Sequence, residues 1–173
     1  DLGHIKRLQI SILQGNFLQF LIRMKNIKSC LELGTFTGYS SLSMALSLPK
    51  NGKIHTIDND ISKNKIAKSF FVKAKVEKKI KTEISDGIIA IEKLIKKKKK
   101  FDLIFIDADK ENYIKYFDKS LKLLNKNGFI IIDNILWKGE VINNMAKDKL
   151  TIKIRNFNDH IKKTKINKYI LPI

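Results

Sequence analysis

The chain has 173 residues, with 35 Lys and Arg against 17 Asp and Glu, which makes a formal net charge of +18. This length suits one domain with its own core, so we expect residues 1–173 to form a single domain. The single cysteine excludes an internal disulfide and a cysteine-based zinc site, and no apolar run approaches the ~20 residues of a membrane span. The opening stretch, DLGHIKRLQ, lacks the basic-then-apolar pattern of a secretory signal, and we expect a cytoplasmic protein.

Apolar runs of strand length alternate with segments of helical period. Strands are expected at residues 29–34, 52–58, 81–85, 101–107 and 128–133. Helices are expected around residues 17–22 and at 39–48, 62–77, 87–98, 111–125 and 150–163, with Gly128 after Asn127 acting as a helix stop. This alternation predicts an α/β fold whose mostly parallel, doubly wound sheet has helices on both faces. Ligands of such sheets bind at the carboxyl ends of the strands.

The basic charge has two explanations that the sequence leaves open. A net charge of +18 attracts nucleic acid or anionic membrane without specificity. The joint abundance of Lys, Ile and Asn is also what an AT-rich coding bias produces. The lysine run at residues 96–100 precedes an expected strand, so we expect it to form a solvated loop at the edge of the sheet away from the ligand site.

A glycine-containing turn follows the first expected strand. In ELGTFTGYSS (32–41), Gly34 and Gly38 allow a tight turn and a close approach to a ligand. Asp58 ends the second strand, at roughly the ~20-residue distance at which an acid meets a ribose hydroxyl in nucleotide-binding sheets. The two features together indicate an adenosine-containing cofactor, and at this point NAD and S-adenosylmethionine both qualify.

Polar side chains end the fourth and fifth expected strands. Asp107 and Asp133 are the last residues of these strands, and Asn134 follows at once. If the strands are neighbours, two carboxylates and an amide oxygen converge, and a hard divalent cation relieves the repulsion between the carboxylates. The alternative is that these residues cap helices or form turns. Trp137, a few positions later, is either a core anchor or one wall of an aromatic substrate pocket.

Three stretches carry a resemblance to a known family. LELGTFTGYSSLSMAL, IFIDADKENY and IIDNILWKGEV resemble the cation-dependent O-methyltransferases, the family of caffeoyl-CoA O-methyltransferase. The resemblance implies a Rossmann-like sheet of the class I methyltransferase type, S-adenosylmethionine as cofactor, a divalent metal (Mg²⁺, or Mn²⁺ or Ca²⁺) and often a homodimer.

The resemblance also implies roles for individual residues. The expected cofactor contacts are Glu32, Gly34, Thr35, Gly38, Ser40, Asp58 on the ribose, Asp86 and Gly87 near the adenine, and Asp109 at the methionine amino group. The expected metal ligands are Asp107, Asp133 and Asn134, Lys110 is the expected general base, and Trp137 is the expected substrate contact. The family more often has Ala where Gly87 stands. Relatives also continue past Ile173 into a last strand, so we expect an unpaired sheet edge here.

The resulting hypothesis is an enzyme that moves a methyl group from S-adenosylmethionine to a phenolic hydroxyl of a catechol-like acceptor, with a divalent metal. One alternative keeps the chemistry and takes tRNA hydroxyuridine as the acceptor. A second alternative is a non-catalytic remnant that binds the cofactor or a partner. No membrane partner is expected.

Overall fold

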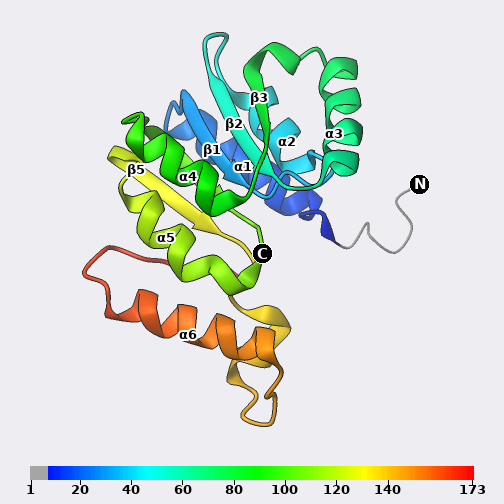
Figure 1. Cartoon of the computed structure of the whole chain (residues 1–173). Coiled ribbons are helices and arrows are strands. Elements are labelled where there is room, and N and C mark those ends of the chain that lie inside the picture. Colours follow the sequence, from blue (N-terminus) through cyan, green and yellow to red (C-terminus); the bar gives the residue numbers. More distant parts are fainter. Residues whose placement is uncertain (1–7) are drawn as a thin grey trace.

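The computed structural model describes residues 8–173, and its centre is a five-stranded parallel sheet (Figure 1). The strands are β1 (Ser29–Leu33), β2 (Lys53–Asp58), β3 (Ile80–Ile84), β4 (Phe101–Ile106) and β5 (Leu124–Ile132). Their order across the sheet is β3-β2-β1-β4-β5, with every neighbouring pair parallel. The chain therefore reverses its direction of travel at β1, which confirms the predicted doubly wound sheet.

Helices cover both faces of this sheet (Figure 1). They are α1 (Ile12–Met24), α2 (Tyr39–Ser47), α3 (Ile61–Lys73), α4 (Gly87–Lys96), α5 (Tyr113–Leu121) and α6 (Lys149–Lys163), with short 3₁₀ segments η2 (Glu77–Lys79), η3 (Lys110–Asn112) and η4 (Trp137–Ile142). None of the helices between residues 8 and 173 combines the length and the apolar character needed to span a bilayer.

Successive residues of a buried strand pack into two separate hydrophobic cores, one on each face of the sheet. Cys30 belongs to the cluster that packs against α1, α2 and α3, whereas its neighbour Leu31 belongs to the cluster that packs against α4, α5 and α6. Side chains of a strand alternate between the faces of a sheet, so a strand covered on both faces must be apolar at consecutive positions. This is why the apolar runs in the sequence identify the strands.

The fifth strand begins earlier than expected. Residues 111–125 were expected to be helical and the strand to start at Gly128, but α5 ends at Leu121 and β5 starts at Leu124. Gly128 is thus not a helix stop. Gly128 and the preceding Asn127, whose φ is 64°, lie where the pairing register between β4 and β5 shifts. A Cβ at Gly128 would lie 2.9 Å from the carbonyl oxygen of Asp102, so the close approach of the two strands requires glycine here.

The outer edge of β5 pairs with no strand among residues 8–173. This agrees with the expected unpaired edge. The residues of β5 from Gly128 to Ile132 are only partly buried, and several of them border the large cavity described below.

Candidate active site

One cavity of about 2160 Å³ lies at the carboxyl ends of the strands. It brings together most of the residues predicted for the site, namely Gly34, Thr35, Ser40, Asp58, Asp86, Gly87, Asp107, Asp109, Lys110, Asp133, Asn134 and Trp137. These residues come from the ends of all five strands, so the parallel topology assembles the site. Glu32 and Gly38 do not line this cavity.

The turn between β1 and α2 passes directly over the end of β4. Gly34 has a φ of 96°, and a Cβ there would lie 1.9 Å from the backbone oxygen of Asp107. Gly38 has a φ of 83°, and its Cβ would lie 2.7 Å from Ala67 and Phe71 of α3. Both glycines are therefore required by packing within the chain. The turn lies close to Asp107 as a consequence.

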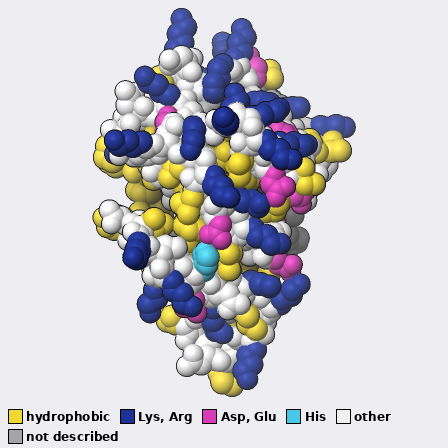
Figure 2. Space-filling model, turned by 60° about the vertical axis from the view of Figure 1, so that its left-hand side comes forward, with side chains coloured by type: hydrophobic (Ala, Val, Ile, Leu, Met, Phe, Trp, Pro, Cys, Tyr) yellow, Lys and Arg dark blue, Asp and Glu magenta, His cyan; other side chains and the backbone are white. Residues whose placement is uncertain are grey.

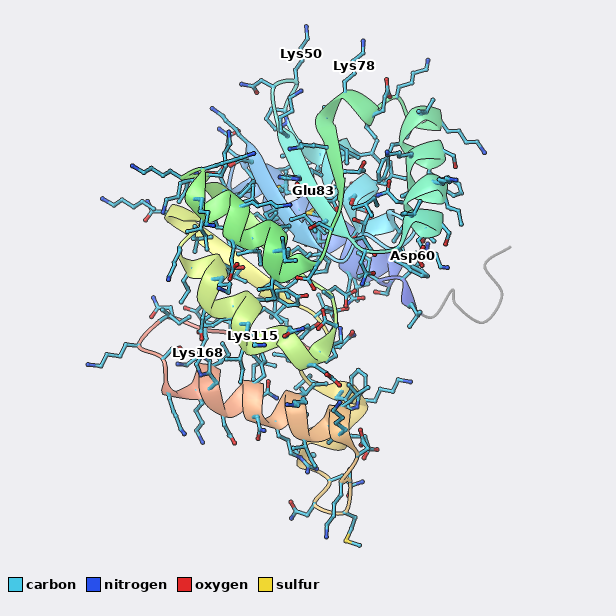
Figure 3. All side chains as sticks on the ribbon, viewed as in Figure 1. Lys50, Asp60, Lys78, Glu83, Lys115 and Lys168 are labelled. Carbon is cyan, nitrogen blue, oxygen red and sulfur yellow. The ribbon has the colours of Figure 1, made fainter. Side chains whose placement is uncertain are left out.

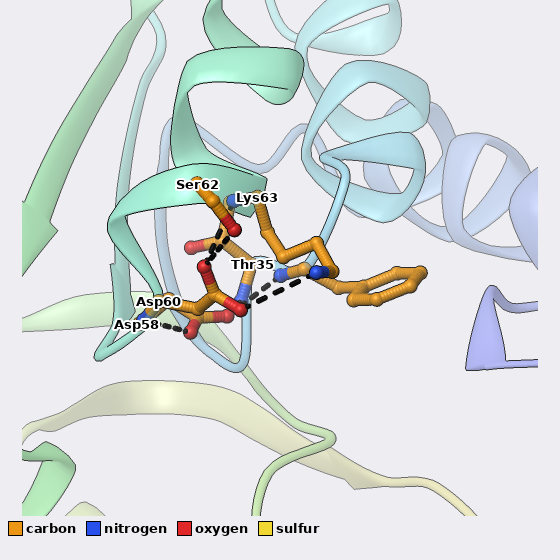
Figure 4. Close-up of polar contacts among 6 residues, drawn as sticks. Thr35, Asp58, Asp60, Ser62 and Lys63 are labelled. Carbon is orange, nitrogen blue, oxygen red and sulfur yellow. Dashed lines mark hydrogen bonds and ion pairs between the residues drawn. The ribbon is translucent and has the colours of Figure 1, made fainter. Parts of the chain in front are cut away.

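Asp58 holds this turn in place through its carboxylate (Figure 4). Its Oδ2 accepts hydrogen bonds from the backbone N–H groups of Thr35, at 2.9 Å, and Phe36, at 2.7 Å. Its Oδ1 accepts one from the N–H of Asp60, at 2.9 Å. Each carboxylate oxygen accepts about two hydrogen bonds, so Oδ1 keeps a lone pair for a further donor. The ribose contact stays a prediction that this geometry allows.

Glu32 lies beneath the turn and has no exposed surface. Its Oε2 accepts hydrogen bonds from the hydroxyls of Ser41 and Thr56, and Thr56 also contacts the hydroxyl of Thr35 at 2.5 Å. Its Oε1 has no hydrogen-bond partner. Burial raises the pKa of Glu32 to about 7. Glu32 thus supports the turn from below, and its direct contact with a cofactor stays a prediction.

The predicted metal ligands lie at the ends of two neighbouring strands. β4 and β5 are paired, with Ile106 opposite Ile132, so Asp107 and Asp133 follow at adjacent positions. Burial, and next the negative charge of Asp107, raise the pKa of Asp133. Asn134 follows with a φ of 59°. Residues 8–173 hold no group of three or more His, Cys, Asp or Glu that could bind a metal. The predicted set of three ligands therefore depends on the amide of Asn134, and it stays a prediction.

The chain's own donors occupy part of this oxygen cluster. Lys110 Nζ donates to Oδ1 of Asp107 at 2.8 Å and to the hydroxyl of Tyr113 at 2.5 Å. The Tyr113 hydroxyl donates to the backbone oxygen of Asp133 at 3.1 Å, and Gln14 Nε2 donates to Asp133 Oδ1 at 2.8 Å. Burial, followed by the nearby carboxylates, raises the pKa of Tyr113, so it is a neutral phenol. The all-oxygen set with two converging carboxylates fits a hard divalent cation.

Asp109 has hydrogen-bond partners different from those of the predicted metal ligands, although it is only two residues from Asp107. Its Oδ1 accepts from the hydroxyl of Tyr116 at 2.5 Å and its Oδ2 accepts from Asn112 Nδ2 at 2.6 Å. A Cβ at Gly87 would lie 2.7 Å from that same Tyr116 hydroxyl. The absence of a side chain at Gly87 therefore leaves room for Tyr116 to reach Asp109.

Trp137 stands at the first position of η4, with a φ of 46°, and is half-buried. It borders the cavity rather than belonging to either apolar core cluster. The position agrees with a pocket wall better than with a core anchor.

Comparison with known proteins assigns the chain to a family. A model of the O-methyltransferase family matches residues 3–173. The chain belongs to this O-methyltransferase family. Caffeoyl-CoA O-methyltransferase of Populus kitakamiensis is 39% identical over 141 residues, covering 80% of this chain and 60% of the relative. Mouse catechol O-methyltransferase domain-containing protein 1 is 35% identical over 150 residues, covering 86% of this chain and 57% of the relative.

Solved structures of O-methyltransferases have the same fold. The Bacillus cereus O-methyltransferase in complex with SAH superposes with a TM-score of 0.85 at 33% identity, covering 91% of this chain and 72% of that one. TomG of Streptomyces achromogenes, in complex with SAM, gives a TM-score of 0.85 at 29% identity, with 91% and 71% covered. The fold is thus the Rossmann-like class I methyltransferase fold. The chain spans about 60% of the length of curated relatives that it matches.

Sequence reasoning did not identify three polar side chains that contact the predicted site residues. Gln14 lies far away in the sequence, and Tyr113 and Tyr116 fall within the expected helix at residues 111–125, where no site role was expected for them. The two tyrosines could have indicated a polar site nearby, because the hydroxyl of a buried Tyr normally needs a hydrogen-bond partner, whereas Phe needs none. Tyr113 donates to the backbone oxygen of Asp133, which follows β5, and Tyr116 donates to the carboxylate of Asp109, which follows β4. Nothing in the sequence around Gln14 indicates Asp133 as its partner.

Proposed function

We propose that this chain carries the catalytic domain of an O-methyltransferase that uses S-adenosylmethionine and a divalent metal. The observation that carries the proposal is the joint placement of Asp58, Asp107, Asp109 and Asp133 around one cavity, in a member of the O-methyltransferase family. The cofactor supplies a methyl group on a sulfonium sulfur, and the reaction moves this methyl to a phenolic oxygen. The acceptor loses its hydroxyl proton in the exchange.

The cofactor half of the cavity is formed by the turn after β1 and by the ends of β2, β3 and β4. In this proposal Oδ1 of Asp58 accepts a hydrogen bond from a ribose hydroxyl. Asp109 accepts from the methionine ammonium, with its orientation set by Tyr116 and Asn112. Gly34, Thr35 and Ser40 form the wall on which the cofactor rests, and Asp86 and Gly87 border the adenine end. Holding both substrates in attack geometry supplies a term that can reach ~7–11 kcal/mol.

The acceptor half is formed by Asp107, Asp133, Asn134, Lys110 and Trp137. A divalent cation held by Asp107, Asp133 and Asn134 supplies Lewis-acid stabilisation of a phenolate oxygen. Lys110 would accept the acceptor's proton at Nζ only as a neutral amine, so its ammonium would first release a proton to solvent, a loss that a cation bound beside it would favour. Tyr113 keeps the Lys110 amine at the site, since its hydroxyl contacts the same Nζ. Trp137 forms one wall for an aromatic acceptor of the caffeoyl or catechol type.

A methyl-transfer assay with labelled S-adenosylmethionine tests the proposal. We expect transfer to members of a catechol panel, loss of transfer with EDTA, and recovery with Mg²⁺. Asp133→Asn should reduce turnover by at least ~100-fold while retaining the fold, and Glu77→Gln, at an exposed carboxylate of η2 that does not line the cavity, should behave as wild type. Transfer that EDTA leaves unchanged would contradict the metal role. Transfer to tRNA alone would replace the phenolic acceptor by the hydroxyuridine alternative, and cofactor binding without transfer to any acceptor would favour the non-catalytic reading.

We also propose a homodimer. The supporting observation is the outer face of α1, where Ile12, Leu13, Phe20 and Met24 are each more than half exposed, at 73%, 61%, 56% and 58%. Apolar side chains gathered on one helix face are typical of a protein interface. Light scattering on the purified chain tests this, with Phe20→Ser expected to shift a dimer to a monomer and a monomeric wild type contradicting it.

A further inference from the structure

The amino ends of the five strands form a surface at the opposite edge of the sheet from the predicted site residues. It consists of the loops at residues 25–28, 48–52, 74–79, 97–100 and 122–123, which precede the five strands, together with the first residues of β2, β3 and β5 (53, 80 and 124–127). The cavity also extends to Lys25, Leu124 and Asn127 at this edge. The cationic residues of this surface are Lys25, Lys28, Lys50, Lys53, Lys75, Lys78, Lys79, Lys97, Lys98, Lys99, Lys100, Lys122 and Lys126. We call these lysines the amino-edge lysine face. The run at residues 97–100 is therefore one part of a larger surface.

The strand order places these loops side by side. Five neighbouring strands about 4.8 Å apart extend the face over roughly 20 Å. Figure 3 shows Lys50 and Lys78 projecting together from one end of the molecule, whereas Lys115 and Lys168 lie in the other half. Figure 2 shows dark blue Lys and Arg side chains projecting from that same upper end.

The charge of this face is not neutralised by acidic side chains. All its lysines except Lys79 are exposed, and none is in an ion pair among those found in residues 8–173. The acidic residues at this edge are Glu77 and Asp102. Asp102 accepts hydrogen bonds from Ser29 N, at 2.9 Å, and Asn125 Nδ2, at 2.7 Å, so its carboxylate is committed to joining the strands. Glu77 alone faces solvent among the lysines.

The remaining side chains of these loops limit the kind of partner. Among their apolar residues Ile27, Leu48, Val76 and Leu123 are buried. Pro49, Ala74, Ile80 and Leu124 are half-buried, so these segments offer no fully exposed apolar side chain for insertion into a membrane. The loops contain no aromatic residue on which an unpaired base could stack, and no arginine for bidentate contacts to base edges. What they present is a row of ammonium groups, which suits the phosphates of a nucleic-acid backbone.

We propose that the amino-edge lysine face binds the phosphate backbone of double-stranded nucleic acid without reading its sequence. Contacts to phosphates fix position and orientation and carry no sequence information directly. Because the lysines of the face, apart from Lys25, do not line the cavity that holds Asp58, Asp107 and Asp133, this binding is separate from the proposed methyl transfer. It would hold the protein on a duplex while the cavity stays open to its own substrate.

The test measures binding of the full chain to a fluorescently labelled RNA duplex by anisotropy, from 50 to 200 mM salt. One variant, K50Q/K78Q/K98Q/K126Q, removes four exposed lysines from the face. A matched control, K115Q/K153Q/K162Q/K165Q, removes four exposed lysines from the α5 and α6 side, so both variants have the same net charge. We expect the face variant to bind at least ~10-fold more weakly and to have a shallower salt dependence, with ~0.9 lost from the logarithmic slope per phosphate contact removed. The control should bind within about twofold of wild type.

Additional binding measurements with other partners distinguish between the possible results. A DNA duplex of the same length should bind comparably, and unpaired RNA more weakly. Equal losses in both variants would overturn the proposal, because net charge rather than the face would then govern binding. So would binding to phosphatidylserine vesicles without binding to duplex. Methyl transfer to a small phenolic acceptor should be the same in the face variant and wild type, so an inactive wild type would count against the proposed activity and leave the binding result standing.

Discussion

Gln14, on α1, donates a hydrogen bond from Nε2 to Oδ1 of Asp133, at the end of β5, over 2.8 Å and across 119 positions of sequence. The other atom of the same amide is also used. Gln14 Oε1 accepts from the N–H of Ser11 at 2.7 Å and completes the capping box of α1. One side chain thus begins a helix with its oxygen and orients a proposed metal ligand with its nitrogen.

The first prediction concerns Gln14→Glu. Glutamate keeps an oxygen for the capping box and replaces the donor to Asp133 by a second negative charge. We expect the free energy of unfolding at pH 7 to fall by about 1–3 kcal/mol. The raised pKa of Asp133 should rise further, so the native state binds its proton more tightly and the lost stability returns as the pH is lowered. Added Mg²⁺ should also restore stability, because a cation relieves the repulsion.

Urea unfolding at pH 7 and pH 5, with and without Mg²⁺, measures these effects. Gln19→Glu, at a half-buried position of the same helix, is the control. If the two variants were equally stable under all conditions, the Gln14–Asp133 contact would have no energetic role.

The second prediction separates two tyrosines of one helix. Tyr113→Phe removes the hydroxyl that contacts Lys110 Nζ and the backbone of Asp133, so under the proposed mechanism kcat should fall by about 10–100-fold. Tyr116→Phe removes the donor to Asp109, so the Kd for S-adenosylmethionine should rise about tenfold with a smaller effect on kcat. Steady-state kinetics and calorimetry on both variants provide the measurement. A change in the same parameter for both would argue against separate roles.

The positions of many site residues could be predicted from the sequence, because the parallel sheet places the ends of its strands at one edge. A residue that ends a strand must lie at the ligand edge of such a sheet, so Asp58, Asp107 and Asp133 could be placed without coordinates. The same reasoning placed the lysine run 96–100 at the far edge. Gly34 and Gly38 of the turn were also identified, but for close approach to a ligand. In the structure, a side chain at these positions would instead clash with the backbone of Asp107 and with side chains of α3.

Contacts between distant side chains could not be predicted in this way. The start of β5 was misplaced because Asn127-Gly128 is a common end of a helix, and only the packing of Gly128 against Asp102 reveals a strand irregularity. The cofactor contact of Glu32 stays a prediction, whereas its hydrogen bonds from the hydroxyls of Ser41 and Thr56 are contacts that no local pattern predicts. Gln14 reaches Asp133 only because α1 packs over the end of β5.

The third prediction is that the free energy of unfolding depends on pH through the protonation of Glu32. Its pKa is 4.5 when unperturbed and about 7 in the fold, where burial favours the neutral form. The native state therefore binds this proton more tightly than the unfolded state, and the stabilisation is complete below pH 4.5 and lost as the pH rises to 7. The step amounts to about 3 kcal/mol at 1.36 kcal/mol per pKa unit. Unfolding free energies measured from pH 4 to 8 should contain this fall in wild type and lack it in Glu32→Gln. Asp60→Asn, at an exposed helix cap, should leave the step unchanged, and a step retained in Glu32→Gln would assign it to another group.

The last prediction compares two glycines with nearly the same backbone. Gly34 and Gly139 have φ values of 96° and 88°, so alanine at either position incurs a similar conformational strain of about 1–2 kcal/mol. At Gly139 nothing lies within 4 Å of an added Cβ, whereas at Gly34 the backbone oxygen of Asp107 lies 1.9 Å away. That oxygen belongs to the end of a central strand and cannot move aside cheaply. Gly139→Ala should therefore lose only the strain, measured by urea unfolding.

Gly34→Ala should lose at least ~3 kcal/mol more than Gly139→Ala, or fail to unfold cooperatively, because the turn and Asp107 have to separate. The same displacement should weaken Mg²⁺ binding in any Gly34→Ala protein that folds, while Gly139→Ala keeps wild-type affinity in a calorimetric titration. Equal stability losses in the two variants would mean that the turn does not rest on Asp107. That result would contradict the proposal that the cofactor turn and the proposed metal ligand Asp107 are coupled.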